Sequence, residues 1–185
     1  MATTTRITLD QYLRTAYEPD AEFVNGEVEE RNVGEYDHNV VQREILFWFH
    51  RHDKEWKTRT IQEQRTRLDS GIVRIPDVSV WARGVPVQPV FNQPQLIAIE
   101  VLSPEDRHAK MQQRIEDYRR FGVKHIWIVD PVKRQGWDCS DGNWTVNNRF
   151  QLAGTPVYLD LDELFQRLDE AEALDLRCLG FIRPC

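Results

Sequence analysis

The sequence predicts an α/β (α+β) fold in which helices flank a mixed central sheet. Two segments, residues 95–102 and 125–129, are almost continuously apolar, which is typical of strands that are covered on both faces. The segment between them carries apolar residues at helical spacing. A strand–helix–strand unit of this form is usually a right-handed parallel crossover, so we expect one parallel strand pair within the sheet.

Local motifs define the N-terminal elements. Thr8 and Gln11 have the spacing of a capping box, which predicts a short helix over about 9–17. The dipeptide Asn25-Gly26 lies between two short strand-like segments and predicts a hairpin. Residues 36–52 place their large apolar side chains on one stripe of a helix, so we expect an amphipathic helix there.

The middle of the chain contains several strand-like segments and one helix. Residues 55–68 alternate loosely between polar and apolar side chains, and residues 72–75 and 78–81 are rich in Val and Ile. The run Ser-Pro-Glu-Asp at 103–106 combines a favoured N-cap, a proline for the first helical position and acids for the first turn. It therefore predicts a helix over 104–121.

The C-terminal part adds a hairpin, a strand and a helix. Gly122 is the expected C-cap of the preceding helix. Asp141-Gly142 predicts a hairpin turn, residues 157–159 a short strand, and residues 161–170 a last helix. The tail, residues 171–185, is not assigned to any element.

Composition limits the class of protein. The length of 185 residues corresponds to a single domain, which we place at 1–185. No apolar run reaches the roughly 18–20 residues of a membrane span, and the first residues are too polar for a signal peptide. The three cysteines lack paired spacing, which indicates a reducing compartment. We therefore expect a cytoplasmic protein with no membrane segment.

The charge balance constrains how the protein could bind a nucleic acid. A net charge of −6 excludes binding through a general positive field, so a local basic patch or a metal ion would be needed. The most basic segment spans 51–67, and its Lys57, Arg59, Arg65 and Arg67 are candidate contacts to DNA phosphates. A solvated face of the protein would explain the same residues equally well.

A charged residue inside a buried strand is the first candidate for chemistry. Glu100 interrupts the apolar segment 95–102, and an unpaired carboxylate there would cost several kcal/mol, on the order given for buried charge. Either an Arg or Lys, or a divalent metal, must compensate it. Asp77 follows Pro76 at the start of the preceding strand. If the two strands are neighbours, both carboxylates face one side and repel each other unless a cation lies between them.

The ordered set of these residues resembles a known superfamily. Pro76-Asp77, followed by Glu100-Val101-Leu102, is similar to the signature of the PD-(D/E)XK nucleases, in which Pro-Asp precedes acid–x–Lys on the next strand. Within that superfamily the chain resembles the putative restriction-endonuclease family, formerly a domain of unknown function, over about 8–165. The residues that carry this resemblance are 22–27, His38, 75–78, 99–104, Tyr118, 122–123 and 126–131.

The resemblance implies a restriction-endonuclease-like sheet and metal-dependent hydrolysis of DNA phosphodiester bonds. It implies that Asp77 and Glu100 bind Mg²⁺ or Mn²⁺, with the carbonyl of Val101 as a possible third ligand. Glu22 matches a recurrent acid that would contact the metal or its water. His38 matches a recurrent histidine without an assigned role, and we favour a packing or surface position for it.

The sequence departs from the signature at the lysine. The residue two positions after Glu100 is Leu102, and the family resembled here supplies a cation from the following helix, where this chain has Lys110 and Arg114. At about 3.3 Å per strand residue and 1.5 Å per helix residue, Lys110 lies about level with Glu100, and Arg114 lies one turn further. We expect Arg114 to be the positional equivalent, which can only stabilise charge, and Lys110 to be a substitute proton carrier. Either could instead be only an ion-pair partner.

Two other classes of function remain open at this stage. The replacement of the signature lysine by Lys110 and Arg114 favours the first, a catalytically degenerate nuclease-fold protein that binds a nucleic acid or a protein. A glycosidase with two carboxylates is a more remote alternative. For the nuclease we expect a homodimer, because cleavage of both strands by an enzyme with one site usually requires two-fold symmetry.

Overall fold

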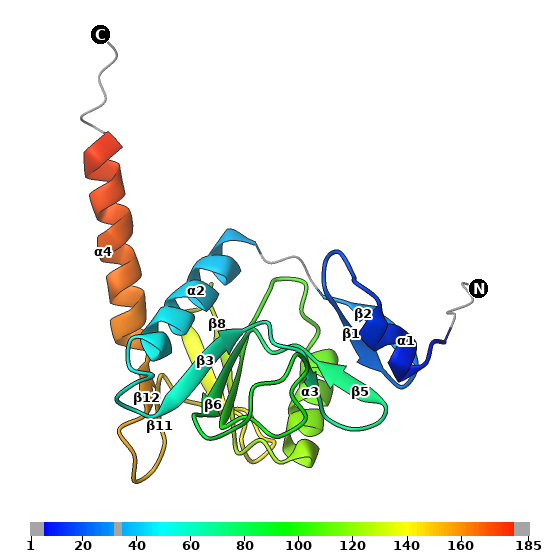
Figure 1. The fold of residues 1–185 in the computed structure, drawn as a ribbon. Helices are drawn as coiled ribbons and strands as arrows, with labels where there is room; N and C mark the ends of the chain where they lie inside the picture. Colours follow the sequence, from blue (N-terminus) through cyan, green and yellow to red (C-terminus); the bar gives the residue numbers. More distant parts are fainter. Residues whose placement is uncertain (1–5, 32–34, 180–185) are drawn as a thin grey trace.

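The computed structural model describes residues 6–31 and 35–179. A mixed six-stranded sheet forms its centre (Figure 1). In spatial order its strands are β10 (Thr145–Val146), β9 (Gln135–Asp138), β8 (His125–Asp130), β7 (Ile97–Val101), β6 (Val78–Ala82) and β3 (Thr58–Gln62). The two most apolar strands, β7 and β8, run parallel, with Ile97 opposite His125. The other pairs of this sheet are antiparallel, so the predicted mixed sheet is confirmed.

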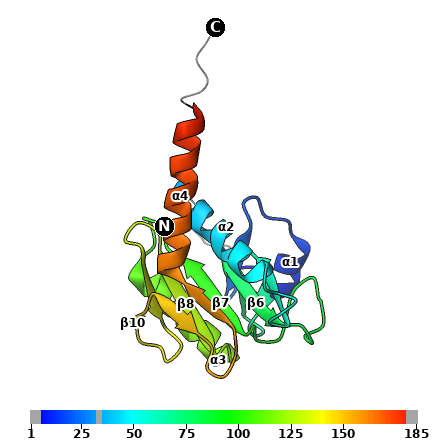
Figure 2. The ribbon, with the colours of Figure 1, turned by 90° about the vertical axis from the view of Figure 1, so that its left-hand side faces the viewer.

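Helices cover both faces of this sheet (Figures 1 and 2). On one face, α2 (Tyr36–His50) and the first turns of α4 (Leu161–Leu179) pack against alternate residues of β7 and β8. On the other face, α3 (His108–Phe121) packs against the residues in between. Because β7 and β8 are buried on both faces, their sequences are apolar at nearly every position. The helix α3 connects the two parallel strands and is the predicted crossover.

A second, antiparallel sheet lies beside the first. Its strands, in spatial order, are β2 (Glu27–Glu30), β1 (Ala21–Val24), β5 (Ile72–Arg74) and β4 (Thr66–Arg67). The segment predicted as one strand over 55–68 therefore divides into β3 and β4, one in each sheet. The neighbouring segments 72–75 and 78–81 also belong to different sheets, because the chain crosses from one sheet to the other at Pro76-Asp77.

The predicted N-terminal motifs are present. Thr8 and Gln11 form both hydrogen bonds of a capping box, and α1 (Leu9–Arg14) ends three residues earlier than predicted. Asn25 and Gly26 adopt positive φ values of 52° and 93° and join β1 to β2. This is the backbone geometry that Asn-Gly favours in a tight hairpin.

The C-terminal elements follow the prediction and extend it. A small sheet pairs β11 (Arg149–Gln151) with β12 (Tyr158–Asp160). The Asp160 carboxylate accepts a hydrogen bond from the backbone N–H of Glu163 and so caps α4. The helix continues to Leu179, so it includes much of the unassigned tail, while 180–185 lie outside the described residues.

The predicted start of the helix over 104–121 is wrong. The helix begins at His108, and Arg107 occupies the N-cap position without a side-chain hydrogen bond. Ser103 is not the cap, because its hydroxyl lies 3.2 Å from Nδ1 of His38. The backbone N–H of Ser103 instead donates to Asp106 Oδ2 at 2.7 Å, which closes a separate turn before the helix. The predicted C-cap is confirmed, because Gly122 is left-handed with φ 103°.

The second sheet and α3 are joined by a buried guanidinium group. Arg74, on β5, is 2% exposed. Its Nη1 lies 2.7 Å from Glu22 Oε2 on β1, and its Nη2 lies 2.7 Å from Asp117 Oδ2 on α3. Both carboxylates are buried as well. This side chain therefore ties the second sheet to α3.

We predict that Arg74→Ala destabilises the fold by about 3–5 kcal/mol, because it removes the guanidinium group that two buried carboxylates share. Urea unfolding followed by circular dichroism measures this change. Arg120→Ala is the matched control, since Arg120 also faces Asp117, at 3.9 Å, but is largely exposed; its expected cost is below about 1 kcal/mol. Equal losses in the two variants would contradict the prediction.

Candidate active site

The two acids of the sequence motif lie opposite each other at the ends of neighbouring strands. In the antiparallel pair of β6 and β7, Val78 is opposite Ile99, and the next step of this register places Asp77 opposite Glu100. Asp77 Oδ2 accepts a hydrogen bond of 2.7 Å from the backbone N–H of Val101. The Asp77 side chain thus bonds to β7 just beyond the last backbone pair of the two strands. Both acids are buried.

Arg114 connects Glu100 to the second sheet. Its Nη1 lies 3.3 Å from Glu100 Oε2, and its Nη2 lies 3.1 Å from Glu22 Oε2. The other oxygen of Glu100 accepts a hydrogen bond from the hydroxyl of Tyr118, one turn further along α3. The structure therefore brings together Glu100, Glu22 and Arg114, three of the residues predicted from the sequence.

Glu22 is fully engaged by the protein. Its Oε1 accepts from the backbone N–H of Ile75 at 2.9 Å, and its Oε2 contacts both Arg74 and Arg114. Burial alone would raise the pKa of Glu22, but the two guanidinium groups outweigh burial, and the pKa is lowered from its usual value. The ionised carboxylate therefore holds Arg114 in place.

Asp77 has a basic neighbour that the sequence did not indicate. Arg31, just after β2, places Nη2 2.7 Å from Asp77 Oδ1 and Nη1 3.3 Å from Glu63. His38 is buried, with Nε2 3.7 Å from the same Asp77 oxygen, and burial lowers its pKa, which favours the neutral ring. Gln42, one turn later on α2, donates to the carbonyl of Asp77 at 3.1 Å.

The carboxylate pair is left with incomplete charge compensation. Burial raises the pKa of Asp77 to about 6, although Arg31 opposes the shift. Burial likewise raises the pKa of Glu100 to about 8; Arg114 opposes this shift, while the negative charge of Asp77 adds to it. An additional positive charge beside the carboxylates of Asp77 and Glu100 would therefore be favourable.

The donor set of the pair is compatible with a hard cation. No group of three or more His, Cys, Asp or Glu side chains within residues 6–31 and 35–179 is arranged to hold a metal ion. Magnesium, however, is commonly held by one or two carboxylates, with water and substrate phosphate completing the octahedron. Asp77 and Glu100, with the backbone carbonyl of Val101 as a further oxygen, fit that description.

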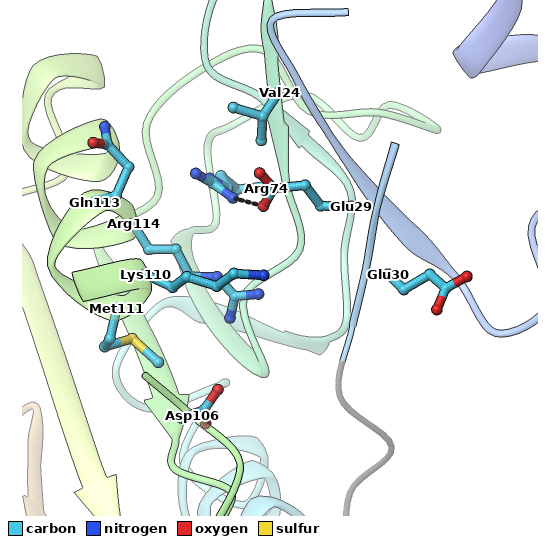
Figure 3. A pocket seen from close by; sticks show the side chains of 9 residues that line it. All are labelled: Val24, Glu29, Glu30, Arg74, Asp106, Lys110, Met111, Gln113 and Arg114. Atoms are coloured by element: carbon cyan, nitrogen blue, oxygen red, sulfur yellow. Dashed lines mark hydrogen bonds and ion pairs between the residues drawn. The ribbon is translucent and has the colours of Figure 1, made fainter. Parts of the chain in front are cut away.

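Figure 3 shows a pocket that we call the basic pocket; neither Asp77 nor Glu100 lines it, but Arg114, the partner of Glu100, does. Lys110 and Arg114 extend into it from α3, and Arg74 faces them from β5. The acids Glu29, Glu30 and Asp106 line the same pocket, and Glu29 lies 3.4 Å from Arg74. Arg114 is partly buried by its two carboxylate partners, whereas Lys110 is exposed and forms no ion pair with a residue that the structure describes. The two cations of α3 therefore differ in environment.

The four basic residues predicted to contact DNA do not converge on this site. Arg65 is paired with Asp20 and lies over the ring of Tyr12. Arg59 donates to the carbonyl of Val85 at 3.1 Å. Lys57 and Arg67 are exposed. Within the described part of the chain, none of the four contacts Asp77 or Glu100.

The sequence did not predict the roles of three residues at this site: the ion pairs of Arg31 and Arg74, and the hydrogen bond from Tyr118 to Glu100. Arg31 and Arg74 contact partners 46 and 52 positions away in the chain, and no periodicity links such pairs. Tyr118 lay on the predicted apolar face of α3, where only its hydroxyl could have indicated a polar role. The one available signal was Arg74 within an otherwise apolar strand.

Comparisons with known proteins agree with the fold. The model of a family described as "Putative restriction endonuclease", Uma2, matches residues 9–159. Among solved structures, the chain is similar to a putative nuclease belonging to DUF820 from Anabaena variabilis ATCC 29413, with a TM-score of 0.73 and 21% identity, over 86% of this chain and 98% of that chain. At this identity the likeness shows the fold alone. None of the curated proteins matches the chain. The helices within the described ranges lack the apolar length of a membrane span.

The raised pKa values predict that the metal-free protein loses stability as the pH rises. The pKa of Glu100 is near 4.5 in the unfolded chain and about 8 in the folded protein. Between these values the folded state holds a proton that the unfolded chain has released, so the free energy of unfolding falls with increasing pH. One such proton changes stability by at most about 1.4 kcal/mol per pH unit.

Urea unfolding in EDTA at several values between pH 5 and pH 9 measures this slope. Glu100→Gln removes the titration, so its slope between about pH 6 and pH 8 is expected to be shallower than that of the wild type. Glu105→Gln, at an exposed position, should retain the wild-type slope. A slope that is unchanged in Glu100→Gln would contradict the assignment.

Proposed function

This chain belongs to the Uma2 family, described as putative restriction endonucleases, and from that premise we propose that it hydrolyses DNA phosphodiester bonds with the help of a divalent metal. The observation that carries the proposal is the carboxylate pair of Asp77 and Glu100. The two groups are buried opposite each other at the ends of β6 and β7, and burial raises the pKa of each despite the nearby arginines.

Asp77, Glu100 and the carbonyl of Val101 are the residues that would hold Mg²⁺ or Mn²⁺. When bound, such an ion supplies positive charge next to the phosphate and makes a water molecule a stronger nucleophile. Val101 also fixes the Asp77 side chain through its backbone N–H, and Tyr118 fixes that of Glu100 through its hydroxyl. Both carboxylates are thus oriented before any ligand arrives, which reduces the reorganisation that the reaction requires.

Arg114 is proposed as the cation that replaces the lysine of the signature. A guanidinium group remains protonated and can form two parallel hydrogen bonds with phosphate oxygens. Its contacts with Glu22 and Glu100 direct it toward the carboxylate pair. In this role it stabilises the additional negative charge of the transition state. Glu22 acts as a positioning residue, because both of its oxygens are already occupied by hydrogen bonds within the protein.

Lys110 is proposed as a second, weaker source of positive charge at the pocket. Its exposed ammonium group is solvated by water, so it suits electrostatic attraction of the DNA backbone better than proton transfer. The homodimer remains part of this proposal, since two copies would be needed to cut both strands at one position.

The alternative function is a nuclease-fold protein that binds DNA without cutting it. One observation favours it: Arg31 and Arg114 already pair with Asp77 and Glu100, as they would in a site maintained only for structure. This protein would retain affinity for DNA and show no metal-dependent cleavage.

We predict that supercoiled plasmid is nicked or linearised in Mg²⁺ or Mn²⁺ and remains intact in EDTA. Asp77→Asn should lower the rate by more than about 100-fold, because second-shell changes alone cost roughly 10–100-fold and Asp77 is a proposed ligand. Equal cleavage by wild type and variant would indicate a contaminating nuclease. If neither folded protein cuts but both retard DNA in a gel, the binding function replaces the nuclease.

We also predict different effects for the two cations of α3. Arg114→Ala should lower kcat by about 100–1000-fold, as for other groups that stabilise transition-state charge, whereas Lys110→Ala should lower it about tenfold or less and mainly raise KM. Arg114→Lys retains charge beside Glu22 and should recover part of the rate, which separates catalysis from misfolding. A larger loss of kcat in Lys110→Ala than in Arg114→Ala would reverse the assignment.

A further inference from the structure

A second hollow, of about 340 Å³, lies against the other side of the first turns of α3. We call it the aromatic groove. Two partly exposed tryptophans and three basic side chains are prominent in its lining, together with one apolar residue at the end of β7: Trp137, Trp144, Arg107, His108, Lys133 and Leu102. Its volume is within the range of sites for small ligands.

The aromatic surfaces of this groove are held in fixed positions. The indole N–H of Trp144 donates to Gln112 Oε1 at 2.8 Å, which ties the β9–β10 hairpin to α3. The ring of Trp137 meets that of Trp144 edge to face, with centroids 5.6 Å apart. His108 stacks on Trp144 at 4.8 Å. Rings that are fixed in this way bind a ligand with little loss of conformational freedom.

The aromatic groove adjoins the basic pocket of the candidate active site. Asp106 and Met111 line both hollows. Leu102 follows Glu100 by two residues, so both side chains lie on the same side of the strand, about 7 Å apart along it. A nucleic-acid strand with one phosphate at Glu100 would therefore bring an adjoining nucleotide close to the groove.

The chemistry of the groove fits a nucleotide. Nucleobases stack on aromatic side chains irrespective of their sequence, and basic residues nearby attract the attached phosphate. Arg107 is exposed, while Lys133 forms an ion pair with Asp130, with Nζ 3.2 Å from Oδ2. In a duplex the faces of the bases are covered by their neighbours, so only an unpaired base can use these rings.

We propose that the aromatic groove binds an unpaired nucleobase of the strand that occupies the active site. The substrate class is then DNA with a single-stranded segment next to the cleaved bond. This inference rests on the proposed nuclease function for the identity of the strand, but the binding step itself requires neither metal nor cleavage.

The test is fluorescence anisotropy with the full chain in EDTA. The probes are a labelled oligothymidylate and a labelled duplex of equal length. The wild type should bind the single strand more tightly than the duplex. Trp144→Ala should weaken single-strand binding about 5- to 100-fold, the range expected for losing one stacked base, and leave duplex binding unchanged. Phe47→Ala is the matched control, because Phe47 is an exposed aromatic residue on α2, on the opposite face of the sheet.

Trp144→Phe separates stacking from structure. It keeps an aromatic face and loses the hydrogen bond to Gln112, so most of the single-strand affinity should remain. Equal affinity for both probes, or unchanged single-strand binding in Trp144→Ala, overturns the inference and leaves the groove to another partner, such as a peptide. Single-strand binding that depends on Trp144 without any metal-dependent cleavage would instead retain the groove and reject the proposed nuclease. Metal-dependent cleavage without a preference for the single strand would retain the proposed nuclease and reject the proposed role of the groove.

Discussion

The structure depends on how its buried carboxylates are compensated. Four acids with buried side chains are grouped between the two larger sheets and α3, and three arginines face them; the acids are Glu22, Asp77, Glu100 and Asp117, and the arginines are Arg31, Arg74 and Arg114. A buried carboxylate is tolerated only with such partners. The arginines do not compensate these acids equally, because the pKa of Glu22 is lowered while burial raises those of Asp77 and Glu100. The least compensated carboxylates are therefore those at the two strand ends.

The same network fixes the position of α3. Arg74 joins Asp117 on α3 to β1 and β5, and Arg114 joins α3 to Glu22 and Glu100. These contacts orient the face of the helix that carries Lys110 toward the basic pocket. They also leave His108 and Arg107 on the side where the β9–β10 hairpin supplies its tryptophans. One set of ion pairs thus positions both hollows on either side of α3.

Sequence reasoning succeeded where a local pattern and a tertiary requirement coincide. A single acid in a strand buried on both faces indicated Glu100 as a residue in need of compensation, and the fold places Asp77 opposite it. The parallel crossover was predictable for the same reason, since its two strands are buried on both faces. The start of α3 was not predictable, because Ser103 has the residue type of an N-cap but its hydroxyl is used by His38, which is 65 positions away. Arg31 was missed because nothing near it in the chain indicates that it reaches Asp77.

The absence of the signature lysine is explained by the surroundings of position 102. Leu102 packs with Met111, Trp137 and Trp144 in the apolar cluster between β7 and α3. A lysine there would either bury its ammonium group among these side chains or extend it into the aromatic groove, and burial without a partner is unfavourable. Arg114 supplies positive charge to Glu100 from the helix instead, so position 102 is free to form an apolar wall. Under the proposed function, Leu102 and the aromatic groove therefore belong to one arrangement. In it the positive charge comes from α3 rather than from the strand, and the space beside the strand is open to the proposed base.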